Sequence, residues 1–171
     1  MITASRAVDA VAQSEGEELE IKPLYLEALT LVERLHRRLL DVIKDEFDRM
    51  GRSDVNSVQA LLLFNIGDSE LTAGELRTRG YYLGSNVSYN LKKLVETGYI
   101  HHQRSRMDRR SVRVSLTEKG REVAKIVNDL YERHMLSVEQ VGEIGPQDFV
   151  ALNKSLRRLE RFWTDQILYR L

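Results

Sequence analysis

The stretch SNVSYNLKKLVETGYIHHQRSRMDRRSVRVSL, residues 85–116, decides the fold because its hydrophobic period changes at Gly98. Before the glycine, apolar residues recur at i, i+4, i+7 and i+8, which predicts the inward face of a helix: Val87, Leu91, Leu94 and Val95. After it, residues 99–104 and 111–116 are typical of paired strands, with Val112, Val114 and Leu116 on one face. The stretch therefore predicts a helix that stops at Gly98 and leads into a β-hairpin with a polar tip at residues 105–110.

Two shorter helices are predicted before this stretch, each from a capping box. Asn56 and Gln59 open the apolar segment VQALLLFNIG, and Thr72 and Glu75 open LTAGELRTRG. A turn, GYYLG at residues 80–84, separates the second of these helices from the next. Two helices across a tight turn followed by a hairpin make a winged helix-turn-helix, whose second helix can enter a DNA major groove.

Long amphipathic helices are predicted on both sides of this motif, over residues 24–50, 117–141 and 146–170. Their apolar stripes exceed what the small winged core needs, which favours a twofold dimer. The predicted fold class is mainly α with a small β-hairpin wing. We predict an acidic arm at residues 1–21, a winged domain at 52–116, and a dimerisation region formed by 22–51 and 117–171.

Composition excludes several classes of protein. The chain of 171 residues is 42% hydrophobic and 30% charged, as expected of a soluble globular protein. It has no cysteine, which excludes disulfides, thiolate catalysis and thiol redox sensing and fits a reducing cytoplasm. The longest aliphatic and aromatic run, Ala60 to Phe64, is too short to cross a bilayer, so we expect no membrane association.

Positive charge is concentrated in one segment although the formal net charge of the chain is zero. Residues 72–113 contain nine lysines and arginines and three acids, a net charge of +6. The rest of the chain must then be acidic. Such an asymmetry indicates that one surface meets a polyanion while the remainder keeps the protein soluble.

The candidate DNA contacts fall into two groups, one on the predicted recognition helix and one on the hairpin. The recognition-helix group combines polar side chains that can reach base edges with cations that suit phosphates. Its members are Ser85, Asn86, Ser88, Tyr89, Asn90, Lys92 and Lys93. The wing group consists of five arginines and one acid: Arg104, Arg106, Asp108, Arg109, Arg110 and Arg113. The alternatives are a solvated helix face and a charged edge that merely prevents aggregation.

Other chemistry has weak support in the sequence. His101 and His102 are adjacent on a strand and point to opposite faces, so they cannot ligate one metal together. We find no metal-binding spacing, nucleophile elbow or phosphate-binding loop, and we expect no metal, no cofactor and no enzymatic activity. Four aromatic residues are candidates for an effector pocket, although core packing is the commoner role: Phe47, Phe64, Tyr81 and Tyr82.

The run from Asp108 through Leu116-Thr117-Glu118-Lys119-Gly120 resembles the D-x-R-x5-L-T-x2-G wing signature of the MarR (multiple antibiotic resistance regulator) transcription factors. Gly98-Tyr99-Ile100 is similar to the exit of their recognition helix, and Val87-Ser88 to its start. The resemblance covers roughly residues 24–170 in element order. The chain departs from it in the turn, and at Tyr89, where a DNA-contacting arginine is common.

The resemblance implies an obligate homodimer built from the first and last helices, with an effector pocket between the dimerisation and DNA-binding lobes. It also implies that Arg110 is the arginine that enters the minor groove and that Asp108 orients it. We therefore expect a ligand-responsive regulator, usually a repressor in that family, on a pseudo-palindromic double-stranded operator. The alternative is a winged-helix module that binds another protein rather than DNA.

Overall fold

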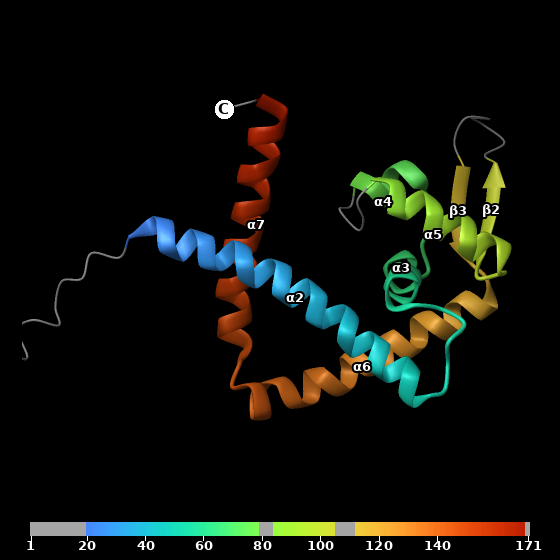
Figure 1. Cartoon of the computed structure of the whole chain (residues 1–171), viewed down its shortest axis with the longest axis horizontal. Helices are drawn as coiled ribbons and strands as arrows, with labels where there is room; N and C mark the ends of the chain where they lie inside the picture. Colours follow the sequence, from blue (N-terminus) through green and yellow to red (C-terminus); the bar gives the residue numbers. More distant parts are fainter. Residues whose placement is uncertain (1–19, 79–83, 105–111, 170–171) are drawn as a thin grey trace, which may run out of the picture. The chain divides into compact units, whose positions relative to one another are not determined.

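The computed structural model of the chain describes residues 20–78, 84–104 and 112–169, and contains six helices and a three-stranded sheet in that part (Figure 1). The chain divides into two units, Met1–Val42 and Ile43–Leu171. Helix α2 (Ile21–Arg49) supplies the described part of the first unit, and its last turns belong to the second. The predicted class, mainly helical with a small β wing, is confirmed.

The core of the second unit forms between two helices that differ in character. Helix α3 (Ser57–Ile66) is apolar around most of its circumference and packs on α6 (Glu118–Gly142), as Figure 1 shows. Fully or nearly fully buried side chains come from both helices and from the end of α2: Ile43, Phe47, Ala60, Leu62, Leu63, Ile66, Val123, Val127 and Leu130. An ion pair between Glu46 and Arg133 also joins α2 to α6.

Both capping boxes predicted from the sequence are present. The Asn56 side chain accepts a hydrogen bond from the Gln59 amide at 2.8 Å, and the Gln59 side chain accepts one from the Asn56 amide at 3.1 Å. Thr72 and Glu75 exchange the same pair of bonds at 2.6 and 3.0 Å. The second box opens the short helix α4 (Ala73–Thr78), which leads towards α5 (Gly84–Glu96).

The predicted hairpin is present as β2 (Ile100–Arg104) and β3 (Val112–Leu116). The two strands are antiparallel, with Ile100 opposite Leu116 and Arg104 opposite Val112. The sequence analysis missed a third strand, β1 (Leu71–Thr72), which pairs with β3 and gives the order β1-β3-β2. A strand of two residues is too short to show the alternation by which strands are predicted.

The long helix α7 (Pro146–Tyr169) begins at the predicted proline, but no residue of it is buried within the described part of the chain. Apolar side chains stand exposed along it, including Leu152 at 45% and Leu156 at 42%. The first unit is similar, because Leu24 and Leu35 of α2 are 47% and 62% exposed. None of the helices in the described ranges is long and apolar enough to span a membrane.

Gly120, in the first turn of α6, gives a test of how closely the elements of the second unit pack. A Cβ atom at this position would lie 2.2 Å from the Tyr99 carbonyl oxygen, a backbone atom that cannot rotate away. We expect Gly120→Ala to reduce the free energy of unfolding by about 2 kcal/mol or more, because either the helix or the strand must shift.

The matched control is Gly74→Ala, because a Cβ there meets nothing nearer than the Thr72 hydroxyl oxygen at 3.7 Å. Urea unfolding followed by circular dichroism measures both variants. Equal stabilities for the two would show that the close approach at Gly120 is wrong.

Candidate nucleic-acid interface

The recognition helix α5 ends at Glu96, two residues before Gly98, the glycine that the sequence predicts to stop it. This glycine has a φ of +82°, which side chains with a Cβ rarely adopt. The amides of Gly98 and Tyr99 then donate to the carbonyls of Val95 and Leu94, at 3.1 and 2.8 Å. The chain therefore leaves the helix with its last carbonyls satisfied and enters β2 directly.

The residues at the start of α6 form hydrogen bonds with the turn that connects α5 to β2. The Thr117 amide donates to the Tyr99 carbonyl at 3.1 Å, and the Thr117 hydroxyl donates to the Gly98 carbonyl at 2.7 Å. The Lys119 ammonium donates to the Thr97 carbonyl at 3.0 Å and lies 4.1 Å from the centre of the Tyr99 ring. Thr117 also caps α6 by accepting from the Gly120 amide. Thr117 and Gly120, the Thr-x-x-Gly part of the wing signature, therefore attach the start of α6 to the end of the recognition helix.

A side-chain network under the same junction was not predicted. The Arg52 guanidinium donates twice to the Asp54 carboxylate, at 3.1 and 2.7 Å, and the Tyr99 hydroxyl donates to that carboxylate as well. The bonds from Arg52 hold the pKa of Asp54 well below its usual range. Burial, followed by the bond to Asp54, raises the pKa of Tyr99 to about 12. Because Asp54 and Tyr99 are 45 residues apart, no local pattern signals their contact.

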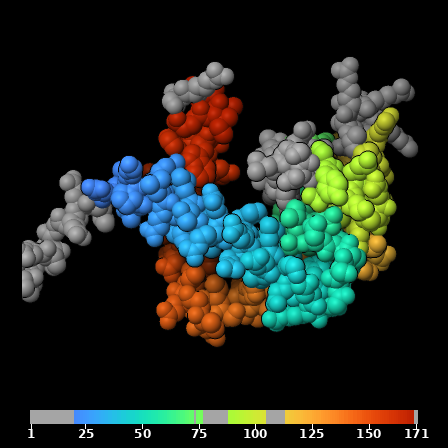
Figure 2. Space-filling view, viewed as in Figure 1, coloured from blue at the N-terminus to red at the C-terminus, as the bar shows by residue number. Residues whose placement is uncertain are grey.

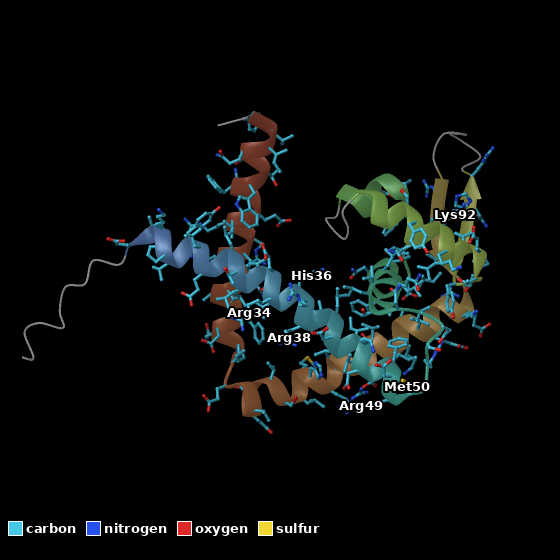
Figure 3. The ribbon with its side chains drawn as sticks, viewed as in Figure 1. Arg34, His36, Arg38, Arg49, Met50 and Lys92 are labelled. Atoms are coloured by element: carbon cyan, nitrogen blue, oxygen red, sulfur yellow. The ribbon has the colours of Figure 1, made fainter. Side chains whose placement is uncertain are left out.

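The exposed side of α5 carries much of the predicted recognition-helix group. Ser88 and Tyr89 are exposed, Tyr89 at 68%, and the Lys92 and Lys93 side chains also face solvent. Figure 3 shows Lys92 on α5 near the hairpin, and in Figure 2 the surfaces of α5 and β2 adjoin. The side chains of Ser85 and Asn86 lie outside the described part, although their backbone belongs to α5.

The prediction that Asn90 lies on the outer side of the helix is wrong. Asn90 is only 8% exposed, comparable with Leu91 at 8%. The physical reason is the helical period: Asn90 lies one turn before Leu94, on the face that packs against the domain. Its polar side chain suggested a contact with bases, but its position places it inside.

The structure describes two of the predicted wing residues, Arg104 and Arg113, and both are exposed. They lie on opposite faces of the hairpin, because Arg113 is opposite Gln103 in the register and Arg104 is opposite Val112. The Arg113 guanidinium is 3.8 Å from the Glu70 carboxylate, so the positive charge of Arg113 is partly neutralised. The remaining members of the group lie outside the described residues: Arg106, Asp108, Arg109 and Arg110.

Of the four aromatic residues predicted for an effector pocket, the structure describes two, Phe47 and Phe64. Phe47 is 3% exposed and packs in the core, with the Arg52 guanidinium 5.9 Å from its ring centre. Phe64 stacks edge-on against Tyr131 and lines a shallow hollow whose described lining does not include Phe47. Tyr81 and Tyr82 lie outside the described residues.

The histidines lie as the strand alternation predicts, with His101 opposite Ser115 and His102 opposite Val114 on the other face. In the described ranges, no three histidine, aspartate or glutamate residues are grouped so as to hold a metal ion.

The fold and the exposed helix-and-hairpin surface define a winged helix protein that binds DNA, and the comparisons agree. A family model of the winged helix DNA-binding domain matches residues 55–120. The exopolysaccharide II synthesis transcriptional activator ExpG of Rhizobium meliloti is 34% identical over 145 residues, covering 85% of this chain and 74% of the activator.

Many solved structures are similar in fold, among them two that concern DNA binding. A mutant of MarR from E. coli in complex with operator DNA has a TM-score of 0.62 at 16% identity, covering 82% of this chain and 99% of that one. BpsR of Bordetella bronchiseptica, whose DNA binding is regulated by 6-hydroxynicotinic acid, has a TM-score of 0.62 at 18% identity, covering 78% and 98%. The chain belongs to the MarR family: it is a DNA-binding transcriptional regulator and not an enzyme.

The network around Asp54 gives a prediction of how stability depends on pH. Because the folded-state pKa is lowered, the carboxylate stabilises the fold above the ordinary aspartate pKa of about 4, and this stability is lost as pH falls below it. We expect Asp54→Asn to cost about 1 kcal/mol at neutral pH, a modest value because the pair is partly exposed. The difference from the wild type should shrink in acid.

Urea unfolding at a series of pH values measures this difference. Asp129→Asn is the control, since its partner Lys125 is 73% exposed and such pairs contribute little. An Asp54→Asn variant as stable as the wild type at neutral pH would contradict the role of the network.

Proposed function

We propose that the protein acts as a homodimer on a pseudo-palindromic operator and that a small molecule modulates its DNA binding. The observation that carries the DNA part is the exposed side of α5, where Ser88, Tyr89, Lys92 and Lys93 face solvent beside the hairpin. Ser88 and Tyr89 stand nearer the start of the helix, where a recognition helix reaches base edges. The lysines, further along, suit phosphates.

The wing completes the proposed interface. Arg104 is exposed at the end of β2, where the chain enters the hairpin tip. The role of Arg110 in the minor groove and of Asp108 in orienting it rests on the wing signature in the sequence. With roughly three to four phosphate contacts per subunit, the logarithm of the binding constant should fall with the logarithm of salt concentration at a slope of about −5 to −7.

The case for a homodimer comes from apolar surface that the chain does not cover itself. Exposed leucines, phenylalanines and isoleucines recur along α7, and the first turns of α2 expose Ile21 at 80% and Leu24 at 47%. Soluble monomers rarely expose such continuous apolar faces. A twofold dimer buries them and sets two recognition helices about 34 Å apart, one turn of DNA.

Modulation by an effector and the direction of regulation are further parts of the proposal. The regulation of BpsR by 6-hydroxynicotinic acid supports a small-molecule effector here. The resemblance favours repression, whereas the relative from Rhizobium meliloti is an activator. Transcription from the native promoter in a purified system, with and without the protein, decides the direction. Because its target is DNA, we place the protein in the cytoplasm.

Substitution of the proposed wing-tip arginine tests the DNA interface. We expect Arg110→Ala to weaken operator binding about tenfold, because a cation in the narrow minor groove is lost. Fluorescence anisotropy with an operator selected from genomic fragments measures the affinity. Arg121→Ala, an exposed arginine on α6 outside the proposed interface, is the control. An unchanged affinity for Arg110→Ala would contradict the proposed wing contact.

A charge placed in the apolar face of α7 tests the dimer. Leu156→Asp should give a particle of one chain, 19.8 kDa, where the wild type gives about twice that mass, because an unpaired carboxylate in an apolar interface is costly. The same change at Lys154, on the opposite side of the helix, should leave the dimer intact. Light scattering after gel filtration measures both variants, and a monomeric wild type at micromolar concentration would overturn the proposal.

A further inference from the structure

Tyr89, on the recognition helix α5, is an aromatic side chain that the fold leaves in solvent. It is 68% exposed, and among the described side chains from residue 51 to 134 no other large apolar or aromatic one is exposed. The two other described tyrosines in this range have partners: the Tyr99 hydroxyl donates to Asp54, and the Tyr131 ring packs edge-on against Phe64. Within the described residues, the Tyr89 side chain makes no comparable contact.

The period of α5 places Tyr89 on the side of the helix that faces away from the domain. Leu91 and Leu94 are 8% and 1% exposed and mark the inward side. The described residues of the exposed stripe of α5 are Ser88, Tyr89, Lys92, Lys93 and Glu96. With about 3.6 residues per turn, Tyr89 lies near the middle of this stripe and almost opposite the two leucines.

The exposed stripe has two sides, and Tyr89 lies on the side away from the hairpin. Ser88 and Lys92 line a hollow between α5 and the hairpin, together with Val114 of β3. Tyr89 and Lys93, each one residue further along the helix, do not line it. Ser88 and Lys92 are therefore turned towards the hairpin, whereas Tyr89 projects from the helix with most of its surface in solvent.

The lysines of the stripe determine what this ring would meet. Lys92 and Lys93 are exposed about one turn after Tyr89 on the same side of the helix. When their ammonium groups pair with phosphates, the side chain nearer the start of the helix lies over the base edges of the major groove. In that groove the apolar group that a base offers is the C5-methyl group of thymine.

We propose that Tyr89 sets the operator sequence at one position of each half-site by packing its ring against the methyl group of a thymine. Cytosine has no methyl group at that place, and the purines present polar atoms to which a ring edge cannot donate or accept a hydrogen bond. Tyr89 is thus a specificity-determining residue that acts through an apolar contact. The inference rests on the proposed DNA-binding function and specifies the base that the helix reads.

A set of protein and DNA variants tests this contact. The probe is a fluorescein-labelled duplex of an operator selected from genomic fragments, in which each thymine is replaced in turn by deoxyuridine. This change keeps every hydrogen-bonding group of the base and removes only the methyl group. At one position, deoxyuridine should weaken binding of the wild type about fourfold, and about fifteenfold when both half-sites carry it, as expected for loss of a buried methyl group.

Three variants assign the effect to the ring, with fluorescence anisotropy at fixed salt concentration as the measurement. Tyr89→Ala should bind the thymine and deoxyuridine operators equally, because the ring is absent. Tyr89→Phe should keep the wild-type difference, because it retains the ring. Lys93→Ala is the matched control from the same stripe: it should weaken binding of both operators by the same factor and lower the salt slope by about one per subunit.

A wild type that prefers the operator to a duplex of shuffled sequence but tolerates deoxyuridine at every position would overturn the inference. A Tyr89→Ala variant that keeps the full difference, or a folded Tyr89→Phe variant that loses it, would do the same. These results would leave the proposed DNA-binding function standing, because the operator is still preferred. A wild type that binds the operator and the shuffled duplex equally would instead overturn the proposed function and this inference with it.

Discussion

The contact of the Tyr99 carbonyl with the first turn of α6 is the constraint on which the DNA-binding domain depends. That oxygen accepts from the Thr117 amide and lies so close to Gly120 that no side chain fits between them. The recognition helix, the hairpin and α6 therefore meet at one backbone junction. Asp54, in the connection between α2 and α3, is joined to the same junction because its carboxylate accepts a hydrogen bond from the Tyr99 hydroxyl. Because these bonds join the end of α5 to the start of β2, they set how the outer side chains of the two elements are placed relative to each other.

The rest of the molecule divides between a domain that buries its own core and helices that do not. Ile43, Leu62 and Val123, which come from α2, α3 and α6, are fully buried. Helix α7 has no buried residue in the described part of the chain, and apolar side chains are exposed along it. Charge is also distributed unevenly, because the segment from 72 to 113 is strongly basic although the chain is neutral overall. The basic segment belongs to the part that binds DNA, and the exposed apolar helices are the surface of the proposed dimer.

Local signals in the sequence predicted the elements well. The capping residues Asn56, Thr72 and Thr117 open helices where expected, and Gly98 ends α5, because each acts on backbone groups within a few residues. The interface was predicted less completely. Asn90 was placed outside on its polarity although its helical position is inward, and β1 was missed because two residues show no period. Only part of the proposed wing lies among the described residues.

The sequence by itself determined the order of the helices and of the two hairpin strands, the winged helix-turn-helix and the family, because caps, hydrophobic periods and the wing signature are local. The tertiary structure decided what depends on residues distant in the chain. The network of Asp54 with Tyr99 joins positions 45 residues apart. A hollow between α5 and the hairpin is lined by Leu91 of α5 together with His102 and Val114, which are opposite each other in the register. Such contacts depend on packing between elements, which no periodicity within one element records.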